Sequence, residues 1–247
     1  MPADSPTQAP PAAALSGRVL VFSKTAGFRH ASIPDAVAAL RRLGAANGFA
    51  VDATEDAAFF EDASLAPYDA VVFALTTGDV LDAPQQAALE RFVRRGRGFV
   101  GIHSASDTEH GWPWYGELVG AFFRQHPAIA SAAVDVADGV HPSTRDLPAR
   151  WTRVDEWYDF ATNPRERVHV LATVDEATYP GGTMGPDHPI AWCRFFDGGR
   201  SWYTAMGHTA ESYADPAFLS HLLGGIRFAA GYPDCDPIPR PRALPPR

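Results

Sequence analysis

Three of the nine histidines follow short apolar segments of the kind that form buried strands. They are His30 after residues 19–22, His103 after residues 99–102 and His208 after residues 202–206. Because ligands of an open parallel sheet bind beyond the carboxyl ends of its strands, we expect at least two of these imidazoles to share a pocket. Neutral imidazole is the commonest metal ligand in proteins, and histidine also suits acid–base catalysis near neutral pH.

The chain is organised around the segment that contains the second of these histidines. Its apolar part, residues 99–102, ends abruptly in a polar cluster that includes His103 and Asp107, which is how a buried strand delivers side chains to a site. Gly98 and Gly101 favour this interpretation over a strand followed by an ordinary polar loop. Glycine within a strand usually marks the close approach of another backbone or of a ligand.

Two kinds of chemistry fit these residues. In the first, His30, His103 and His208 bind a divalent metal such as zinc or manganese, since a catalytic zinc site takes three protein ligands and leaves one position open. The sequence contains neither HExxH nor CxxC, so spacing adds no support. In the second, His103 and His208 are acid–base groups, with Asp107 and Glu156 as hydrogen-bonding or proton-transfer partners.

Aromatic side chains and carboxylates are concentrated in residues 112–115 and 151–160. A sugar ring requires both, because its C–H face stacks on aromatic rings while its hydroxyls donate to carboxylates. Trp112 and Tyr158 are therefore candidate walls of a sugar pocket; the alternative is that they fill the core, as single large aromatic residues usually do. The other candidate substrate contacts are Thr77, Gly78 and Glu211.

Two further carboxylates are candidates for roles beside the histidines. Glu211 stands three residues after His208 and is placed to orient that ring, although a solvated glutamate at the start of a helix fits equally well. Asp155 precedes Glu156. The remaining histidines have simpler explanations: His126, His141 and His188 precede prolines and are predicted to be surface or turn residues, His169 and His221 are predicted to be structural, and His110 stays open.

The first hundred residues alternate between apolar strand-like segments and amphipathic helical ones. Strands are predicted at 19–22, 49–52, 68–75 and 99–102, with helices that begin after the caps Ser32 and Asp82. This alternation is typical of a parallel sheet with helices on both faces. After His103 several β-like segments follow, at 131–136, 168–173, 190–196 and 201–206, which predict a mixed or antiparallel extension, and a last helix begins at Asp215-Pro216 and ends at Gly231.

Length and charge set the broad class. The chain has 247 residues, 46% of them hydrophobic, and a formal net charge of -8. We expect a leader without a core pattern in residues 1–16, one α/β domain in residues 17–231 and a Pro-rich tail in residues 232–247. The acidic balance argues against nucleic acid and membrane partners, and no secretory signal is evident, so a cytoplasmic location is expected. The cysteines, Cys193 and Cys235, do not form a disulfide framework, and Cys193 is predicted to be buried.

A set of motifs resembles a known family. The motifs are VLVFS (19–23), GFRH (27–30), GFVGIHSASD (98–107), WPWY (112–115), DEWY (155–158), HPIAW (188–192) and GHTAES (207–212). Together they are similar to ThuA-like proteins, the trehalose utilisation family, over roughly residues 18–231. The family is similar in fold to class I glutamine amidotransferases, which implies a flavodoxin-like three-layer sandwich with its site at the strand ends.

The same resemblance shows which chemistry is missing. In amidotransferases the strand that corresponds to residues 99–102 ends in Gly-Ile-Cys, and the cysteine is the nucleophile. Here Gly101 and Ile102 are followed by His103, and Ser104 is only a weak substitute for a nucleophile, so glutamine hydrolysis is not expected. The family's association with trehalose catabolism implies a sugar or keto-sugar substrate, and some relatives hold a metal in this pocket, which would suit His30, His103 and His208.

The favoured hypothesis is an intracellular enzyme that acts on a sugar or keto-sugar by hydrolysis, isomerisation or elimination, with a divalent metal as its only expected cofactor and no nucleotide. The alternatives are a non-catalytic sugar-binding or regulatory module and, less favoured, a structural subunit of a complex. The sequence contains no helix-turn-helix with a basic recognition helix, which opposes DNA-binding regulation. The oligomeric state, including a homo-oligomer, is open.

Overall fold

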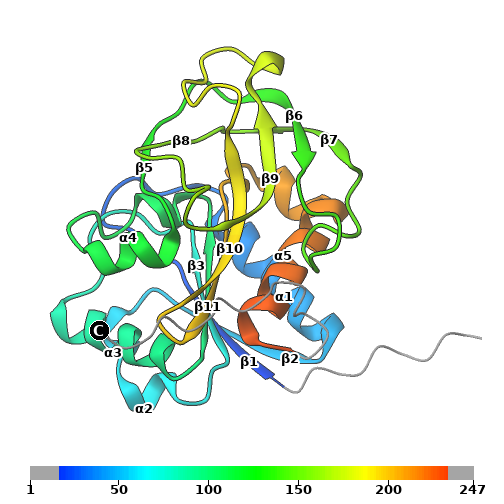
Figure 1. The fold of residues 1–247 in the computed structure, drawn as a ribbon. Coiled ribbons are helices and arrows are strands. Elements are labelled where there is room, and N and C mark those ends of the chain that lie inside the picture. Colours follow the sequence, from blue (N-terminus) through cyan, green and yellow to red (C-terminus); the bar gives the residue numbers. More distant parts are fainter. Residues whose placement is uncertain (1–16, 233–247) are drawn as a thin grey trace, which may run out of the picture.

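A nine-stranded sheet forms the centre of the molecule (Figure 1). A computed structural model describes residues 17–232; the predictions for the leader, for the tail beyond residue 232 and for Cys235 lie outside the described residues. The strands of this sheet are β1 (Gly17–Phe22), β2 (Phe49–Thr54), β3 (Ala70–Ala74), β4 (Gly98–Ile102), β6 (Ala130–Val136), β7 (Arg150–Asp155), β9 (His169–Asp175), β10 (Pro189–Phe196) and β11 (Gly199–Thr204), in the order β2-β1-β3-β4-β11-β10-β9-β6-β7.

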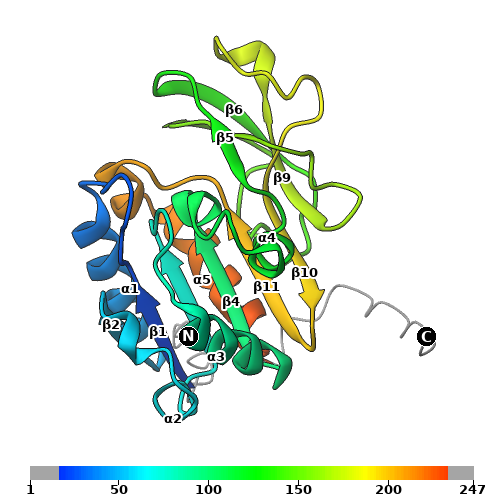
Figure 2. The ribbon, with the colours of Figure 1, turned by 90° about the vertical axis from the view of Figure 1, so that its left-hand side faces the viewer.

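The helices and a small second sheet complete the fold. The α-helices are α1 (Ile33–Asn47), α2 (Asp62–Leu65), α3 (Ala83–Arg94), α4 (Pro113–Val119) and α5 (Pro216–Ala230), the short 3-10 helices are Ala57–Phe59, His103–Asp107, Glu176–Thr178 and Ala210–Ala214, and β5 (Phe123–Gln125) pairs with β8 (Asp159–Phe160). Helices α1 and α5 cover one face of the main sheet, and α3 and α4 cover the other (Figure 2). In the described part of the chain no helix is long and apolar enough to cross a bilayer.

The main sheet changes from parallel to antiparallel halfway across. Strands β2, β1, β3, β4 and β11 are parallel to one another. From β11 onward each pairing, with β10, β9, β6 and β7 in turn, is antiparallel. The predicted flavodoxin-like three-layer α/β fold with an antiparallel extension is therefore confirmed. All five residues of β3 and of β4 are buried, as expected for central parallel strands covered on both faces.

Glycines set the distance between α5 and the sheet. A Cβ atom on Gly98 would lie 2.3 Å from the carbonyl oxygen of Ala229, and one on Gly225 would lie 2.4 Å from the Trp202 ring. The interpretation of Gly98 as a site of close backbone approach is thus correct, and the approaching backbone is α5. Because β4 and β11 pack closely against this helix, the ends of both strands, after which His103 and His208 follow, are held in place.

Several helix ends follow the sequence rules for caps. Asp82 accepts a hydrogen bond from the backbone N–H of Gln85 and forms a capping box with it, and Gly48 and Gly231 end α1 and α5 in the left-handed conformation. Ser32 does not cap α1 as predicted. Its hydroxyl instead donates to the carbonyl oxygen of His208 at 2.6 Å, so this side chain ties the start of α1 to the loop after β11.

Candidate metal and acid–base site

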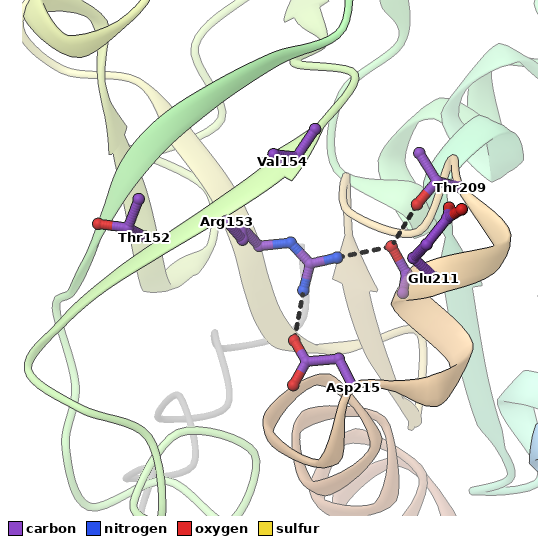
Figure 3. Close-up of a pocket in the computed structure, with 7 residues that line it drawn as sticks. Thr152, Arg153, Val154, Thr209, Glu211 and Asp215 are labelled. Atoms are coloured by element: carbon purple, nitrogen blue, oxygen red, sulfur yellow. Dashed lines mark hydrogen bonds and ion pairs between the residues drawn. The ribbon is translucent and has the colours of Figure 1, made fainter.

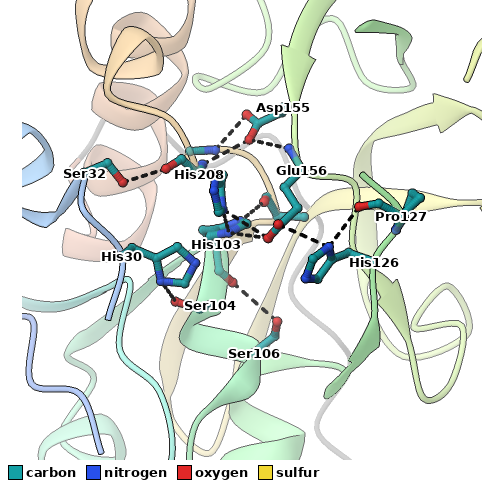
Figure 4. A network of polar contacts seen from close by, with 12 residues as sticks. His30, Ser32, His103, Ser104, Ser106, His126, Pro127, Asp155, Glu156 and His208 are labelled. Atoms are coloured by element: carbon teal, nitrogen blue, oxygen red, sulfur yellow. Dashed lines mark hydrogen bonds and ion pairs between the residues drawn. The ribbon is translucent and has the colours of Figure 1, made fainter. Parts of the chain in front are cut away.

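Three strand ends bring the predicted histidines together. His30 lies in the loop after β1, His103 directly follows β4 and His208 follows β11, and all three strands run parallel (Figure 4). Their ring centroids are 4.8 Å apart for His30 and His103, 5.0 Å for His30 and His208, and 5.1 Å for His103 and His208. The carboxyl edge of the parallel sheet therefore carries one histidine cluster.

Glu156, which follows β7, completes a set of four donor side chains. Its Oε2 lies 3.0 Å from His208 Nδ1 and 3.4 Å from His103 Nε2, and these two nitrogens are 3.2 Å apart. A tetrahedral zinc ion with bonds of about 2.0–2.2 Å separates its ligand atoms by roughly 3.3–3.6 Å. The observed separations are close to these values, and the imidazole and carboxylate donors are ones that zinc accepts, so the residues fit a divalent metal.

The backbone and the hydrogen bonds of His103 direct one nitrogen toward this centre. His103 has φ 51°, a left-handed conformation that costs a non-glycine residue about 1–3 kcal/mol and usually marks a functional turn. The Tyr203 hydroxyl holds this turn by donating to the His103 carbonyl at 2.8 Å. Nδ1 lies 2.6 Å from the Ala205 carbonyl, which can only accept, so Nδ1 carries a proton and Nε2 faces Glu156 and His208, the orientation in which a second hydrogen bond fixes a metal-binding histidine.

The pKa values of His30, Glu156 and His208 also suit metal binding. Burial, followed by the charges of His103 and His208, lowers the pKa of His30 to about 3, so this imidazole is neutral at physiological pH. Burial opposes ionisation of Glu156, but hydrogen bonds from His103 and His208 outweigh it and hold the pKa of this carboxyl well below its usual range. The hydrogen bond to Glu156 in turn raises the pKa of His208. The cluster thus pairs an ionised carboxylate with imidazoles.

Asp155 anchors two of the four donors from behind. This fully buried carboxylate accepts hydrogen bonds from the backbone N–H groups of Glu156 at 3.0 Å, Gly207 at 2.9 Å and His208 at 3.0 Å. Arg153 neutralises it through Nη2 at 2.8 Å. One side chain therefore joins the end of β7 to the loop after β11 and sets the spacing between Glu156 and His208.

Replacing Asp155 is expected to loosen the cluster without removing a donor. In Asp155→Asn, one carboxylate oxygen becomes an amide that faces N–H groups, and Arg153 loses its buried counter-charge. We expect divalent metal affinity to fall about 10- to 100-fold, the typical cost of losing an outer partner of a metal site, and the free energy of unfolding to fall by about 3 kcal/mol. A zinc titration against a competing chelator and urea unfolding measure the two effects.

A neighbouring carboxylate serves as the control for this variant. The Asp215 carboxylate lies 3.6 Å from Arg153 and accepts from the Ala217 N–H, and among the described residues no hydrogen bond or ion pair joins this carboxylate to Glu156, Gly207 or His208. Asp215→Asn should leave zinc affinity within about twofold of wild type. Equal affinities for Asp155→Asn and wild type would show that the cluster keeps its spacing without this carboxylate.

Thr77 and Gly78 lie beside the cluster and hold its loops. The Thr77 hydroxyl donates to the Phe28 carbonyl at 2.8 Å and accepts from the Gly27 N–H at 3.2 Å. The Gly78 N–H donates to the Asp107 carbonyl at 2.8 Å. These residues, predicted as substrate contacts, thus connect the loop that carries His30 to the turn after β4.

The other predicted site residues divide between the cluster and its surroundings. Tyr158 lies against it, with its ring centroid 4.2 Å from that of His103, and burial raises the pKa of its phenol. The Asp107 carboxylate pairs with His110 at 2.9 Å instead of with the three histidines. Trp112 stacks on Trp114 at 5.1 Å, next to α4, and has no described contact with the cluster.

Glu211 does not orient the His208 ring. It lines a separate cavity of about 500 Å³ together with Thr152, Arg153, Val154, Thr209, Ser212 and Asp215 (Figure 3). The side chain that contacts the His208 ring is Glu156. Arg153, which lines this cavity, bonds to Asp155, the carboxylate that anchors Glu156 and His208.

His126 is a member of the site that sequence analysis placed on the surface. Its Nδ1 lies 3.1 Å from Glu156 Oε1 and 2.9 Å from the Pro127 carbonyl, and its ring stacks on Tyr158 (Figure 4). Both partners of Nδ1 are acceptors, so Nδ1 carries the proton and Nε2 is free to accept one. A half-exposed imidazole oriented by a carboxylate is an arrangement suited to proton transfer. No signal in the sequence linked His126 to Glu156, because the two residues lie far apart in the chain.

His141 and His188 lie in turn or loop segments, as predicted, but they are fully buried and do not lie at the surface. The His188 ring lies between Glu176 Oε1 at 2.8 Å and the Tyr158 carbonyl at 2.9 Å, and His141 contacts the Ser143 hydroxyl at 2.8 Å. Each imidazole thus satisfies buried polar groups. Cys193 is buried, as predicted.

The fold and the site together define a flavodoxin-like α/β protein with a cluster of histidines and one glutamate at the strand ends. The sequence matches the family described as trehalose utilisation, ThuA, over residues 18–229, and the chain belongs to this family. Among curated proteins no match is found.

Solved structures support the same fold. A ThuA-like protein from Bacteroides uniformis has a TM-score of 0.74 and 23% identity, with 92% of this chain and 95% of that chain covered. A ThuA-like protein from Parabacteroides merdae has a TM-score of 0.73 and 19% identity, with 88% and 91% covered. A β-galactosidase from Bacillus circulans has a TM-score of 0.55 and 15% identity, and the match covers 86% of this chain but 30% of the enzyme. At these identities the likeness establishes the fold.

Proposed function

We propose that this protein is a metal-dependent enzyme of trehalose or related sugar catabolism, acting on a sugar or keto-sugar. The observation that carries the proposal is the convergence of His30, His103, His208 and Glu156, whose donor atoms all lie within 4.8 Å of one another. Titratable groups with shifted pKa values that converge at the strand ends support an enzyme over a simple sugar-binding module. Membership of the trehalose utilisation family supports the substrate class.

The four donors would hold zinc or manganese, and the bound ion would supply Lewis-acid polarisation of a sugar carbonyl or hydroxyl. His126 supplies the proton transfer in this proposal. Glu156 holds its Nδ1–H through Oε1 and leaves Nε2 as the acceptor, while Oε2 of the same carboxylate faces the histidines. One carboxylate thus fixes the proton-transfer group relative to the donor cluster.

Proton transfer at a carbon next to a ketone fits these residues better than nucleophilic catalysis. The position of the amidotransferase cysteine is taken by His103, whose nitrogen is committed to the Ala205 carbonyl. Ser104 is buried and faces His30 at 3.4 Å, without a base at normal hydrogen-bonding distance. Isomerisation and elimination of a keto-sugar require only carbonyl polarisation and a base, so they are the favoured reactions, with hydrolysis as the remaining one and glutaminase activity excluded from the proposal.

Deuterium exchange separates these reactions. Zinc- or manganese-loaded protein is mixed in D₂O with trehalose, glucose and their ring-oxidised keto derivatives, and proton NMR follows the C–H groups next to the ketone. Isomerisation replaces one of these protons with deuterium and elimination removes it as the leaving group departs, whereas direct hydrolysis releases a monosaccharide with these protons retained. We expect exchange on a keto-sugar, and we expect His126→Gln to slow it about 10²- to 10⁴-fold with metal content unchanged.

His110→Gln is the matched control, because His110 pairs with Asp107 outside the donor cluster. It should retain exchange within a few-fold of wild type. A metal-loaded protein that binds a sugar but neither exchanges nor converts it would identify a binding module. A protein that neither binds nor converts any of these sugars would contradict the proposal altogether.

A further inference from the structure

We propose that Phe28 is a stacking surface for the ring of the substrate, so that an uncharged pyranose or its keto derivative lies between Phe28 and His126. This inference rests on the proposed function and identifies how the site recognises its substrate. The observation behind it is an exposed aromatic ring, 66% accessible, that contacts a member of the donor cluster.

The segment around Phe28 is held from both sides. Thr77 accepts hydrogen bonds from the backbone N–H groups of Ala26 and Gly27, and its hydroxyl donates to the Phe28 carbonyl. On the other side, Arg29 forms a bidentate ion pair with Glu55, at 3.0 and 2.8 Å. The backbone therefore holds Phe28 at the side of His30, which lowers the cost of ordering this loop when a ligand binds.

The position of Phe28 relates it to the reacting groups. Its ring centroid lies 4.9 Å from that of His30, with the two planes at 84°. On another side of the cluster the half-exposed His126 contacts Glu156 and stacks on Tyr158, with the planes at 24°. The rim of the site thus offers an apolar ring beside His30 and an imidazole beside Glu156.

The charge and polarity of this rim select the ligand class. The partly exposed Asp107 carboxylate lies on the side of Tyr158, beside the cluster, so it disfavours an anionic ligand at this rim whether or not a metal is bound. Carboxylates accept hydrogen bonds from hydroxyls, and an aromatic face packs against the C–H face of a pyranose. An uncharged sugar ring offers both the hydroxyls and the C–H face. A phosphorylated sugar offers them too, but it also carries a negative charge that the carboxylate disfavours.

Substitutions at Phe28 test this role through binding. In metal-loaded protein, Phe28→Ala is expected to raise the Kd for the keto-sugar that the wild type binds best, and for trehalose, about tenfold by isothermal titration calorimetry. Phe28→Trp should keep the affinity within about threefold, because it preserves the aromatic face. Metal content should be unchanged in both. Val140→Ala, which truncates another exposed apolar side chain (72% accessible), is the control and should not alter Kd.

Each outcome decides the inference. Equal affinities of wild type and Phe28→Ala would overturn it while leaving the proposed function intact. Equal affinities together with loss of a dimer in light scattering would show that Phe28 is a contact between copies of the chain, which also overturns it. A wild type that binds none of these sugars would overturn both the inference and the proposed function.

Discussion

Wild-type protein is expected to bind one divalent metal per chain, and His103→Asn protein is expected to lose it. The substitution removes Nε2, which lies 3.4 Å from Glu156 Oε2 and 3.2 Å from His208 Nδ1. Asparagine is the appropriate replacement because residue 103 has φ 51°, a conformation that asparagine tolerates better than alanine does. The variant is therefore expected to fold, so that a loss of metal reports the missing imidazole and not a change in backbone conformation. His208→Ala should give the same result, because its imidazole belongs to the same set of donors.

Plasma mass spectrometry after incubation with zinc or manganese and desalting measures the metal content. Activity on a keto-sugar should fall by more than the 10- to 100-fold that an outer partner of a metal site typically contributes. His110→Asn, outside the donor cluster, should retain one metal per chain. A wild-type protein that binds neither metal would refute the metal site and leave only acid–base catalysis or binding. Retention of full metal content in both variants would place the ion elsewhere.

The parallel half of the fold was predictable because its signals are local. The apolar segments before His30 and His103 are buried strands, and Asp82 and Gly231 lie where the sequence rules for helix ends place them. Parallel strands share one carboxyl edge, so residues that follow different strands meet there whatever their separation in sequence. This single rule was enough to place His30, His103 and His208 together.

The antiparallel half was less predictable because its pairing is not local. Residues 150–155 form the edge strand β7, whose side chains alternate between exposed and buried, yet the aromatic residues and carboxylates of residues 151–160 made the segment resemble a sugar-binding surface. Only this pairing explains why Glu156 and His126 reach the histidines, since β7 pairs with β6, which follows His126. Neither contact can be derived from spacing.

Ser32 shows a second limit of local rules. Its position before Pro34 and Asp35 predicts a helix cap, but the tertiary structure offers a different partner, the His208 carbonyl, at 2.6 Å. As a cap the hydroxyl oxygen would accept from a backbone N–H of α1, whereas here the hydroxyl donates to a carbonyl of the loop after β11 and accepts no such bond. Functional loops often override local preferences in this way, because their backbone groups must be satisfied by distant side chains.

Acidification from pH 7 to pH 5 is expected to destabilise the metal-free protein strongly. Burial lowers the pKa of His141 to about 3 and that of His221 to about 4, so both imidazoles are neutral in the folded protein while the unfolded chain binds protons below pH 6.5. Stability from these groups is complete above the unfolded pKa and is lost as the pH falls toward the folded values. Each contributes a loss of about 2 kcal/mol by pH 5, and the lowered pKa of His30 acts in the same direction.

His221→Asn isolates one part of this effect. The His221 Nδ1–H donates to the Ser143 carbonyl at 2.8 Å, a bond that an asparagine amide can replace without a titrating group. Urea unfolding in the presence of a chelator should therefore show a difference between pH 7 and pH 5 that is smaller by about 2 kcal/mol in this variant than in wild type. His110→Asn, which changes an exposed imidazole, should keep the wild-type difference. If His221→Asn keeps it as well, His221 takes up its proton without unfolding, and the acid sensitivity must come from His141 and His30.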